Sequence, residues 1–209
     1  MSQKGLLTVV SGFSGAGKGT LMKALLAKYA DRYALSISAT TRGPREGEQD
    51  GREYFFLKKE EFEQMIEEDA LIEHAQYVGN YYGTPKKYVM EQREAGKDVL
   101  LEIEIQGALK VKEKFPDTLL IFVTPPSAQE LESRLRGRGT ETAEVIEKRL
   151  ARAGEEAVYM DQYDYILVND DLDTCVEELH HLIQSQHARS EENREFCAQM
   201  NQELQVYRK

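Results

Sequence analysis

A glycine-rich segment near the start of the sequence has the residue types and the spacing of a phosphate-binding loop. Residues 12–18 read GFSGAGK, which fits the pattern GxxxxGK. Glycines let successive backbone N–H groups point at phosphate oxygens, and the start of a following helix adds partial positive charge. Lys18 supplies a mobile cation for the β- and γ-phosphates of ATP. The residues predicted to bind ATP here are Gly12, Phe13, Ser14, Gly15, Ala16, Gly17, Lys18, Gly19 and Thr20.

A second group of residues with chemical potential lies further along the chain. Arg42 and Arg45 stand three positions apart and flank Gly43 and Pro44, a composition that disfavours a helix. The planar fork of donors on arginine matches phosphate oxygens in pairs, and the hydroxyl of Tyr54 adds a donor. The segment predicts an anion clamp, although a solvated charged loop is an alternative on these residues alone.

The elements that must position these groups alternate between strands and helices. Short apolar runs, typical of buried parallel strands, cover residues 6–10, 99–103, 119–123 and 165–168. Apolar residues at helical spacing cover 18–29, 106–115 and 127–135, and Ser127 with Glu130 forms a capping box. This alternation predicts an α/β fold, in which a parallel sheet flanked by helices follows the phosphate loop, as in P-loop NTPases.

Residues 33–95 interrupt the alternation and predict a small α+β insertion on this sheet. Its expected elements are strands over 53–57 and 71–77, a helix over 59–69, and a turn at 80–83 before another short strand. The rest divides into a core over 1–32 and 96–185, with a basic lid loop over about 134–152, and a C-terminal helical extension over 186–209.

The extension carries an apolar stripe, formed by Phe196, Met200, Leu204 and Tyr207 at spacings of four, four and three. Such a stripe indicates either a helix that packs on its own core or a helix that contacts a second subunit. A homodimer through this helix is therefore one of two expectations.

The composition of the 209 residues limits the partners of the protein. Its formal net charge of −10 argues against broad binding of nucleic acid or of an anionic membrane, because both need a basic field. Cys175 and Cys197 form neither a CxxC motif nor a zinc spacing, and no apolar run is long enough to span a membrane. We therefore expect a cytoplasmic protein with reduced cysteines.

Several motifs together resemble the guanylate kinase family, within the nucleoside-monophosphate kinases where the sequence GKGT is common. The resemblance covers about residues 5–185. The matching segments are TTRGPREGEQDGREY at 40–54, EHAQYVGNYYGT at 73–84, EIEIQG at 102–107, RLRGRGTE at 134–141 and VNDD at 168–171. Glu102 and Glu104 stand where the family more often has aspartates, and Gly19 replaces the hydroxyl residue that follows the lysine in many members.

The resemblance implies transfer of the ATP γ-phosphoryl group to GMP, giving GDP and ADP in purine nucleotide metabolism. The residues that would hold the GMP phosphate are Arg42, Arg45, Tyr54 and Tyr82. Those that would read the guanine are Ser38, Glu73, Thr84 and Glu104. One carboxylate can accept hydrogen bonds from both the ring N–H and the exocyclic amine of guanine, whereas adenine presents a bare acceptor in place of that ring N–H.

Phosphoryl transfer needs in-line positioning and neutralisation of negative charge. We assign this neutralising role to the positive side chains of Lys18, Arg42, Arg138 and Arg149, with Arg134 as a further candidate. Asn169 is expected at the ATP site. Mg²⁺ is expected with ATP, with Thr20 or bound waters in place of the usual hydroxyl, and with Glu102 as a further ligand.

Two other functions are open to this sequence. A kinase for another nucleotide, such as AMP, gives no reason for the group Ser38, Glu73 and Thr84. A non-catalytic guanylate kinase-like interaction domain would have lost the lysine and glycines of the phosphate loop, which stand here.

Overall fold

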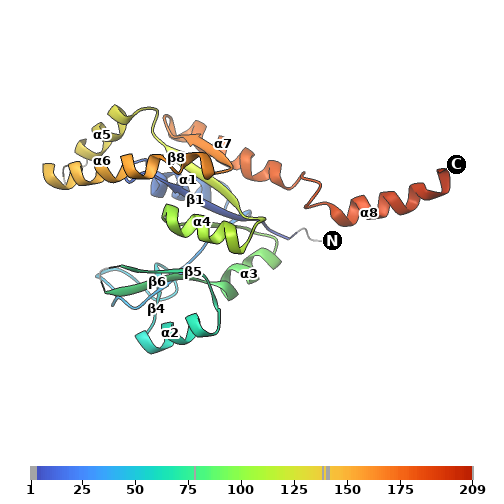
Figure 1. Ribbon diagram of the computed structural model, residues 1–209, viewed down its shortest axis with the longest axis horizontal. Helices are drawn as coiled ribbons and strands as arrows, with labels where there is room; N and C mark the ends of the chain where they lie inside the picture. Colours follow the sequence, from blue (N-terminus) through green and yellow to red (C-terminus); the bar gives the residue numbers. More distant parts are fainter. Residues whose placement is uncertain (1–3, 78, 138, 140–141, 209) are drawn as a thin grey trace.

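A five-stranded parallel sheet forms the centre of the protein (Figure 1). The computed structural model describes residues 4–77, 79–137, 139 and 142–208 and orders these strands β2-β7-β1-β8-β9. The strands are β1 (Leu7–Gly12), β2 (Tyr33–Leu35), β7 (Asp98–Glu102), β8 (Leu119–Thr124) and β9 (Tyr165–Val168). All neighbouring pairs run parallel. The predicted α/β class is therefore confirmed.

Helices cover this sheet and bury its apolar strands. They are α1 (Lys18–Lys28), α3 (Lys86–Glu94), α4 (Ile105–Lys114) and α7 (Leu172–Gln186). Helices α1 and α7 pack against one another, while α4 contacts β1 and β8 and lies toward the second sheet (Figure 1). Val9, Leu100 and Ile121 at the strand centres have no exposed surface, because the sheet is covered on both sides.

A smaller four-stranded sheet, in the order β4-β3-β6-β5, forms the second lobe of the molecule (Figure 1). It contains β3 (Ser38–Thr40), β4 (Tyr54–Phe56), β5 (Leu71–Tyr77) and β6 (Asn80–Pro85), with helix α2 (Lys59–Glu67) between β4 and β5. Strands β3 and β4 run parallel and the other pairs antiparallel. A separate small core of Ala39, Phe62 and Leu71 holds the helix on the sheet.

Two local expectations differ from the structure. The turn expected at Asn80–Gly83 is wrong, because these residues lie in β6 and pair with β5. Gly79, whose φ of +76° favours glycine, stands between the two strands instead. The insertion expected over 33–95 also includes β2, which pairs with β7 in the core sheet, and α3, which packs on β7.

The C-terminal third adds the lid and a projecting tail. The lid region contains α5 (Ala128–Gly137) and α6 (Ala143–Ala157), followed by a 3₁₀ turn at Met160–Gln162. The side chain of Ser127 accepts from the backbone N–H of Glu130 at 3.1 Å, as its capping pattern predicts. After α7 the chain forms α8 (Arg194–Glu203) and a 3₁₀ turn at Leu204–Tyr207, which extend away from the core (Figure 1). None of the helices in the described part of the chain has the length and apolarity needed to span a membrane.

Candidate active site

The phosphate loop joins β1 to α1 in a conformation that requires glycine. Gly12, Gly15 and Gly17 have φ values of +147°, +99° and +88°. A Cβ atom at Gly12 would lie 2.0 Å from the carbonyl oxygen of Val123, so a larger residue would collide with the neighbouring strand. Gly17 caps α1, which places the positive end of that helix at the loop. The segment has the geometry of an anion-binding loop, as its sequence predicts.

Lys18 folds over this loop from the first turn of α1. Its Nζ donates to the carbonyl oxygens of Gly12 at 2.7 Å and of Phe13 at 3.0 Å. The ammonium group is thus held at the mouth of the loop, where it can exchange these carbonyls for phosphate oxygens.

Asn169, at the end of β9, supports the loop from below. Its side-chain Nδ2 donates to the carbonyl oxygen of Ala16 at 2.8 Å, and its backbone carbonyl oxygen accepts from Nη1 of Arg134 at 2.8 Å. The side chain is buried, and a Cβ at Gly17 would come within 2.5 Å of Nδ2. The two predicted residues Asn169 and Arg134 are therefore brought to the loop, where Asn169 fixes the loop backbone.

The lid contributes one further predicted arginine to this place. Arg149 on α6 donates from Nη1 to the hydroxyl of Ser14 in the loop. Arg138 lies outside the described residues. A cation from the lid thus meets the phosphate loop directly.

Thr20 and Glu102, the residues expected to assist a metal ion, line one cavity of about 360 Å³. Its other lining residues are Ser14, Gly15, Gly17, Lys18, Gly19 and Lys23. A hydroxyl and a carboxylate are hard oxygen ligands that suit Mg²⁺ bound to phosphates. Within the described residues, no cluster of three or more histidine, cysteine, aspartate or glutamate side chains could hold a metal by itself. The donor set therefore fits a cation that ATP carries in.

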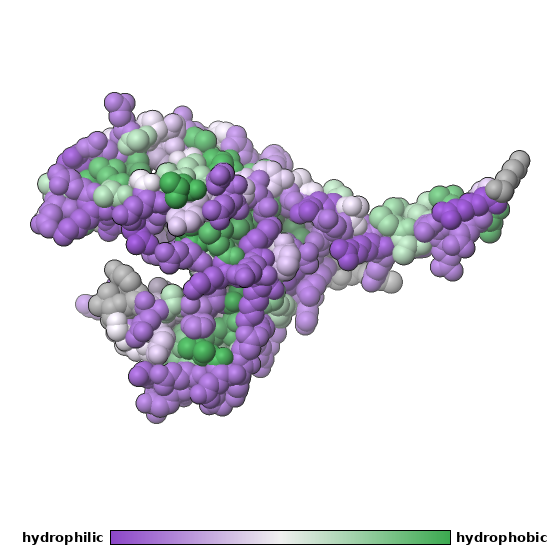
Figure 2. Space-filling view, viewed as in Figure 1, coloured by the Kyte–Doolittle hydropathy of each residue, from purple (hydrophilic) through white to green (hydrophobic). Residues whose placement is uncertain are grey.

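The smaller lobe, which a cleft separates from the core lobe in Figure 2, contains the predicted phosphate clamp. The guanidinium of Arg42 lies 5.4 Å from the ring centroid of Tyr54 and 5.8 Å from that of Phe56. The rings of Tyr54 and Tyr82 meet edge to face at 6.1 Å. The hydrogen bonds to Glu48 are the main cause that raises the pKa of Arg42, and partial burial opposes this shift. Arg45 stays exposed on the loop beyond.

Three of the four residues predicted to read guanine lie on strands of the same lobe. Glu73 on β5 accepts at Oε1 from the hydroxyl of Thr84 on β6 at 2.8 Å, and Ser38 lies on β3. Burial raises the pKa of Glu73, and the Thr84 hydrogen bond opposes this shift. Oε2 of Glu73 would lie 3.6 Å from a Cβ at Gly107, so the carboxylate faces the N-terminal half of α4.

Glu104 is not brought to this group. It caps the start of α4, and its largely exposed carboxylate pairs with Arg152 of α6 at 2.9 Å. Its predicted contact with guanine stays a prediction.

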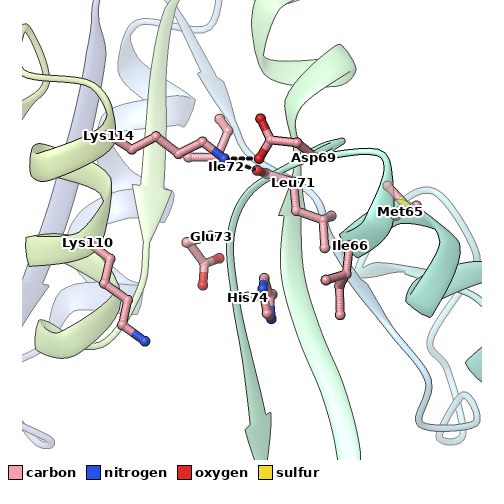
Figure 3. Close-up of a pocket in the computed structure, with 9 residues that line it drawn as sticks. All are labelled: Met65, Ile66, Asp69, Leu71, Ile72, Glu73, His74, Lys110 and Lys114. Atoms are coloured by element: carbon pink, nitrogen blue, oxygen red, sulfur yellow. Dashed lines mark hydrogen bonds and ion pairs between the residues drawn. The ribbon is translucent and has the colours of Figure 1, made fainter.

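A second cavity, of about 230 Å³, lies behind Glu73 where the two lobes join (Figure 3). Lys110 and Lys114 of α4 face it from the core, and Asp69 and Leu71 face it from the smaller lobe. Lys114 donates to the carbonyl oxygen of Leu71 at 3.1 Å and pairs with Asp69. These contacts tie α4 to the start of β5 and so set how Glu73 faces the core.

Sequence reasoning missed three residues at these sites. Glu48 pairs with Arg42, Phe56 lies beside the same guanidinium, and Arg152 pairs with Glu104. Glu48 could have been found because an acidic residue follows the two clamp arginines closely in sequence. Arg152 could have been found because it stands three residues after Arg149, on the same side of a helix. Nothing in the sequence distinguishes Phe56 from a core aromatic.

The parallel sheet carries a glycine-rich loop after its first strand, and a lid arginine contacts that loop. A separate lobe holds two arginines suited to a second phosphate. This arrangement is that of a P-loop kinase of the nucleoside-monophosphate class. The family model for guanylate kinase matches residues 4–186. The chain belongs to the guanylate kinase family.

Individual relatives are similar to this protein over nearly the whole chain. A guanylate kinase of Caldanaerobacter subterraneus subsp. tengcongensis is 51% identical over 97% of this chain and 98% of its own. One of Bacillus cereus is 50% identical over 97% and 99%. The crystal structure of guanylate kinase from Anaplasma phagocytophilum has a TM-score of 0.69 at 31% identity, covering 90% of this chain and 89% of that one.

Proposed function

We propose that this protein transfers the γ-phosphoryl group of ATP to GMP, giving ADP and GDP in purine nucleotide metabolism. The observation that carries this proposal is the partly buried Glu73–Thr84 pair, which lies in the same lobe as the Arg42 clamp. A carboxylate already held by one hydroxyl has acceptor capacity left for the ring N–H and exocyclic amine of guanine. The curated relatives named guanylate kinase support the same substrate.

Each group of site residues then has its own role in the proposed reaction. The loop backbone and Lys18 bind the β- and γ-phosphates, while Arg42, Arg45, Tyr54 and Tyr82 hold the phosphate of GMP in line with the γ-phosphorus. Arg149, with Arg134 and Arg138, neutralises the charge that spreads over the transferring group.

Mg²⁺ supplies further charge neutralisation when it is bound with ATP. We assign Thr20 and Glu102 to its surroundings, because both line the cavity at the phosphate loop.

A coupled assay with ATP and Mg²⁺ against GMP, dGMP, AMP, CMP and UMP tests the function. We expect turnover of GMP with kcat/KM at least about 100-fold above that of AMP, as a mismatched buried polar group implies. Preference for AMP would favour a kinase for another nucleotide. Absence of turnover with every monophosphate would favour the non-catalytic interaction domain.

The proposal includes a cytoplasmic location and a homodimer. The two free cysteines and the use of ATP support the cytoplasm. The projecting C-terminal segment exposes Phe196 and Met200 on α8 and Leu204 and Tyr207 in the 3₁₀ turn that follows. A helix of this length is marginal in water without a partner. Light scattering should give the mass of a dimer for the parent and of a monomer for Phe196→Glu; a monomeric parent refutes the dimer.

A further inference from the structure

Glu48 forms an ion pair with Arg42, the first arginine of the phosphate clamp. Neither the motif analysis nor the proposed reaction gives Glu48 a role. Nη1 and Nη2 of Arg42 donate to Oε2 and Oε1 of Glu48, both at 3.0 Å, in a two-point ion pair. Only 15% of the Arg42 side chain and 18% of the Glu48 side chain are exposed. An ion pair with this two-point geometry contributes more than a typical surface pair.

The same carboxylate also fixes the loop that carries the second clamp arginine. Oε2 of Glu48 accepts from the backbone N–H of Arg45 at 2.7 Å. The hydrogen bond from Arg42, and then the one from the Arg45 backbone, lower the pKa of Glu48. Glu48 therefore stays ionised at neutral pH and links both arginines of the clamp.

The remaining contacts of Arg42 fix the plane of its guanidinium. Nη1 donates its second hydrogen to the carbonyl oxygen of Gly43 at 2.7 Å. The rings of Tyr54 and Phe56 lie within 6 Å of the guanidinium carbon, at 5.4 and 5.8 Å. The group is thus oriented by a carboxylate, a carbonyl and two aromatic rings before any substrate arrives.

The stereochemistry of arginine shows which N–H groups of Arg42 these three hydrogen bonds do not use. A guanidinium has five N–H groups, and these three hydrogen bonds use both on Nη1 and one on Nη2. The other two, on Nε and Nη2, lie along one edge of the plane. That edge is a second two-point donor, and it suits two oxygens of a phosphate.

We propose that Glu48 is a positioning residue for the phosphate of the nucleotide acceptor, which holds Arg42 by the end of its guanidinium so that the Nε–Nη2 edge is presented to that phosphate. This inference rests on the proposed function, in which Arg42 binds the phosphate of GMP. The opposite possibility is that Glu48 is a stand-in, which the incoming phosphate displaces. The two differ in sign, since loss of a holder weakens GMP binding and loss of a competitor strengthens it.

The test compares Glu48→Gln with the matched control Glu46→Gln, an exposed carboxylate two residues earlier in the same loop. The glutamine keeps one acceptor oxygen but loses the charge and the second oxygen. We expect the KM for GMP to rise about tenfold, with less change in kcat and none in the KM for ATP, as the loss of one charge-assisted contact implies. The control should match the parent, and calorimetry should show weaker GMP binding but unchanged guanosine binding, because guanosine has no phosphate.

A double mutant separates positioning from a general loss of structure. Lysine at position 42 cannot form the two-point ion pair with Glu48. In an Arg42→Lys background, Glu48→Gln should therefore leave the KM for GMP unchanged. If Glu48→Gln does not fold, Glu48→Asp should show the same KM effect in smaller size. Aspartate keeps the charge, but its side chain is one methylene shorter and withdraws the carboxylate from the guanidinium of Arg42.

Four results overturn the inference: an unchanged or lower KM for GMP in Glu48→Gln, an equal loss of guanosine binding, an effect that persists in the Arg42→Lys background, or an equal effect of Glu46→Gln. The parent enzyme distinguishes the levels of failure. A parent that does not phosphorylate GMP refutes the proposed function, whereas an active parent with a silent Glu48→Gln refutes only the positioning role.

Discussion

Replacement of Glu73 by glutamine is the sharpest test of how the protein selects its base. In the structure Oε1 of Glu73 accepts from Thr84 at 2.8 Å, and Oε2 faces the start of α4 beside Gly107. Glutamine has one acceptor oxygen and one NH₂ group in place of two acceptors. If its oxygen keeps the Thr84 contact, its NH₂ group must face a guanine N–H, so two donors oppose one another in a buried site.

The magnitude follows from the loss of a charge-assisted hydrogen bond together with an unpaired buried donor. This combination costs roughly 2–4 kcal/mol, which lowers kcat/KM for GMP by about 30- to 900-fold. AMP should lose far less, because the amide can donate to the ring nitrogen of adenine. The assay is the ratio of kcat/KM for GMP to that for AMP in the parent, in Glu73→Gln and in Glu67→Gln, an exposed control on α2. An unchanged ratio in Glu73→Gln would refute the reasoning, and Glu104 would then be tested first.

Three further predictions concern the loop and the pH profile. Lys18→Ala should fold like the parent by circular dichroism but lose at least about 100-fold in kcat, as removal of a charge on the transferring group implies; near-parental turnover would contradict the ATP-site assignment. Asn169→Ala leaves the buried carbonyl of Ala16 without its side-chain donor, so calorimetry should show about 1–3 kcal/mol of lost stability, and an unchanged Tm would contradict this support role. Burial raises the pKa of Glu73 above 4.5. Because the protonated carboxyl cannot accept both guanine N–H groups, kcat/KM for GMP should fall on the acidic side, at a higher pH than an unperturbed glutamate would give. Glu73→Gln should lack that limb, and the same limb in both proteins would contradict the assignment.

The core could be predicted because its strands have continuous apolar runs. The run at 165–168 matches β9 residue for residue, and the helix expected over 18–29 ends one residue earlier as α1. The phosphate loop was predictable for a different reason, since only glycine tolerates the close approach of its backbone to Val123. In both cases the physical requirement lies within a few neighbouring residues.

The parts that sequence reasoning missed depend on contacts between distant elements. Residues 80–83 have a turn-like composition, yet pairing with β5 extends them as a strand. Glu102 and Glu104 stand two apart, but the chain changes from strand to helix between them. Glu102 therefore faces the phosphate loop, whereas Glu104 turns to Arg152. No local pattern specifies which of two neighbouring acids serves the nucleotide site.

The positive charges of the site stand on three separate elements, and this division bears on how ATP is protected from water. Lys18 belongs to the core, Arg149 to the lid helix α6 and Arg42 to the loop after β3. Lys18 and Arg149 both contact the phosphate loop, whereas Arg42 is held in the smaller lobe by Glu48. Under the proposed function, the full set of charges surrounds the γ-phosphoryl group only when the smaller lobe brings GMP to it. Because neutralisation of that group is what lowers the barrier, we infer that the acceptor nucleotide completes the catalytic site and that water alone does not complete it.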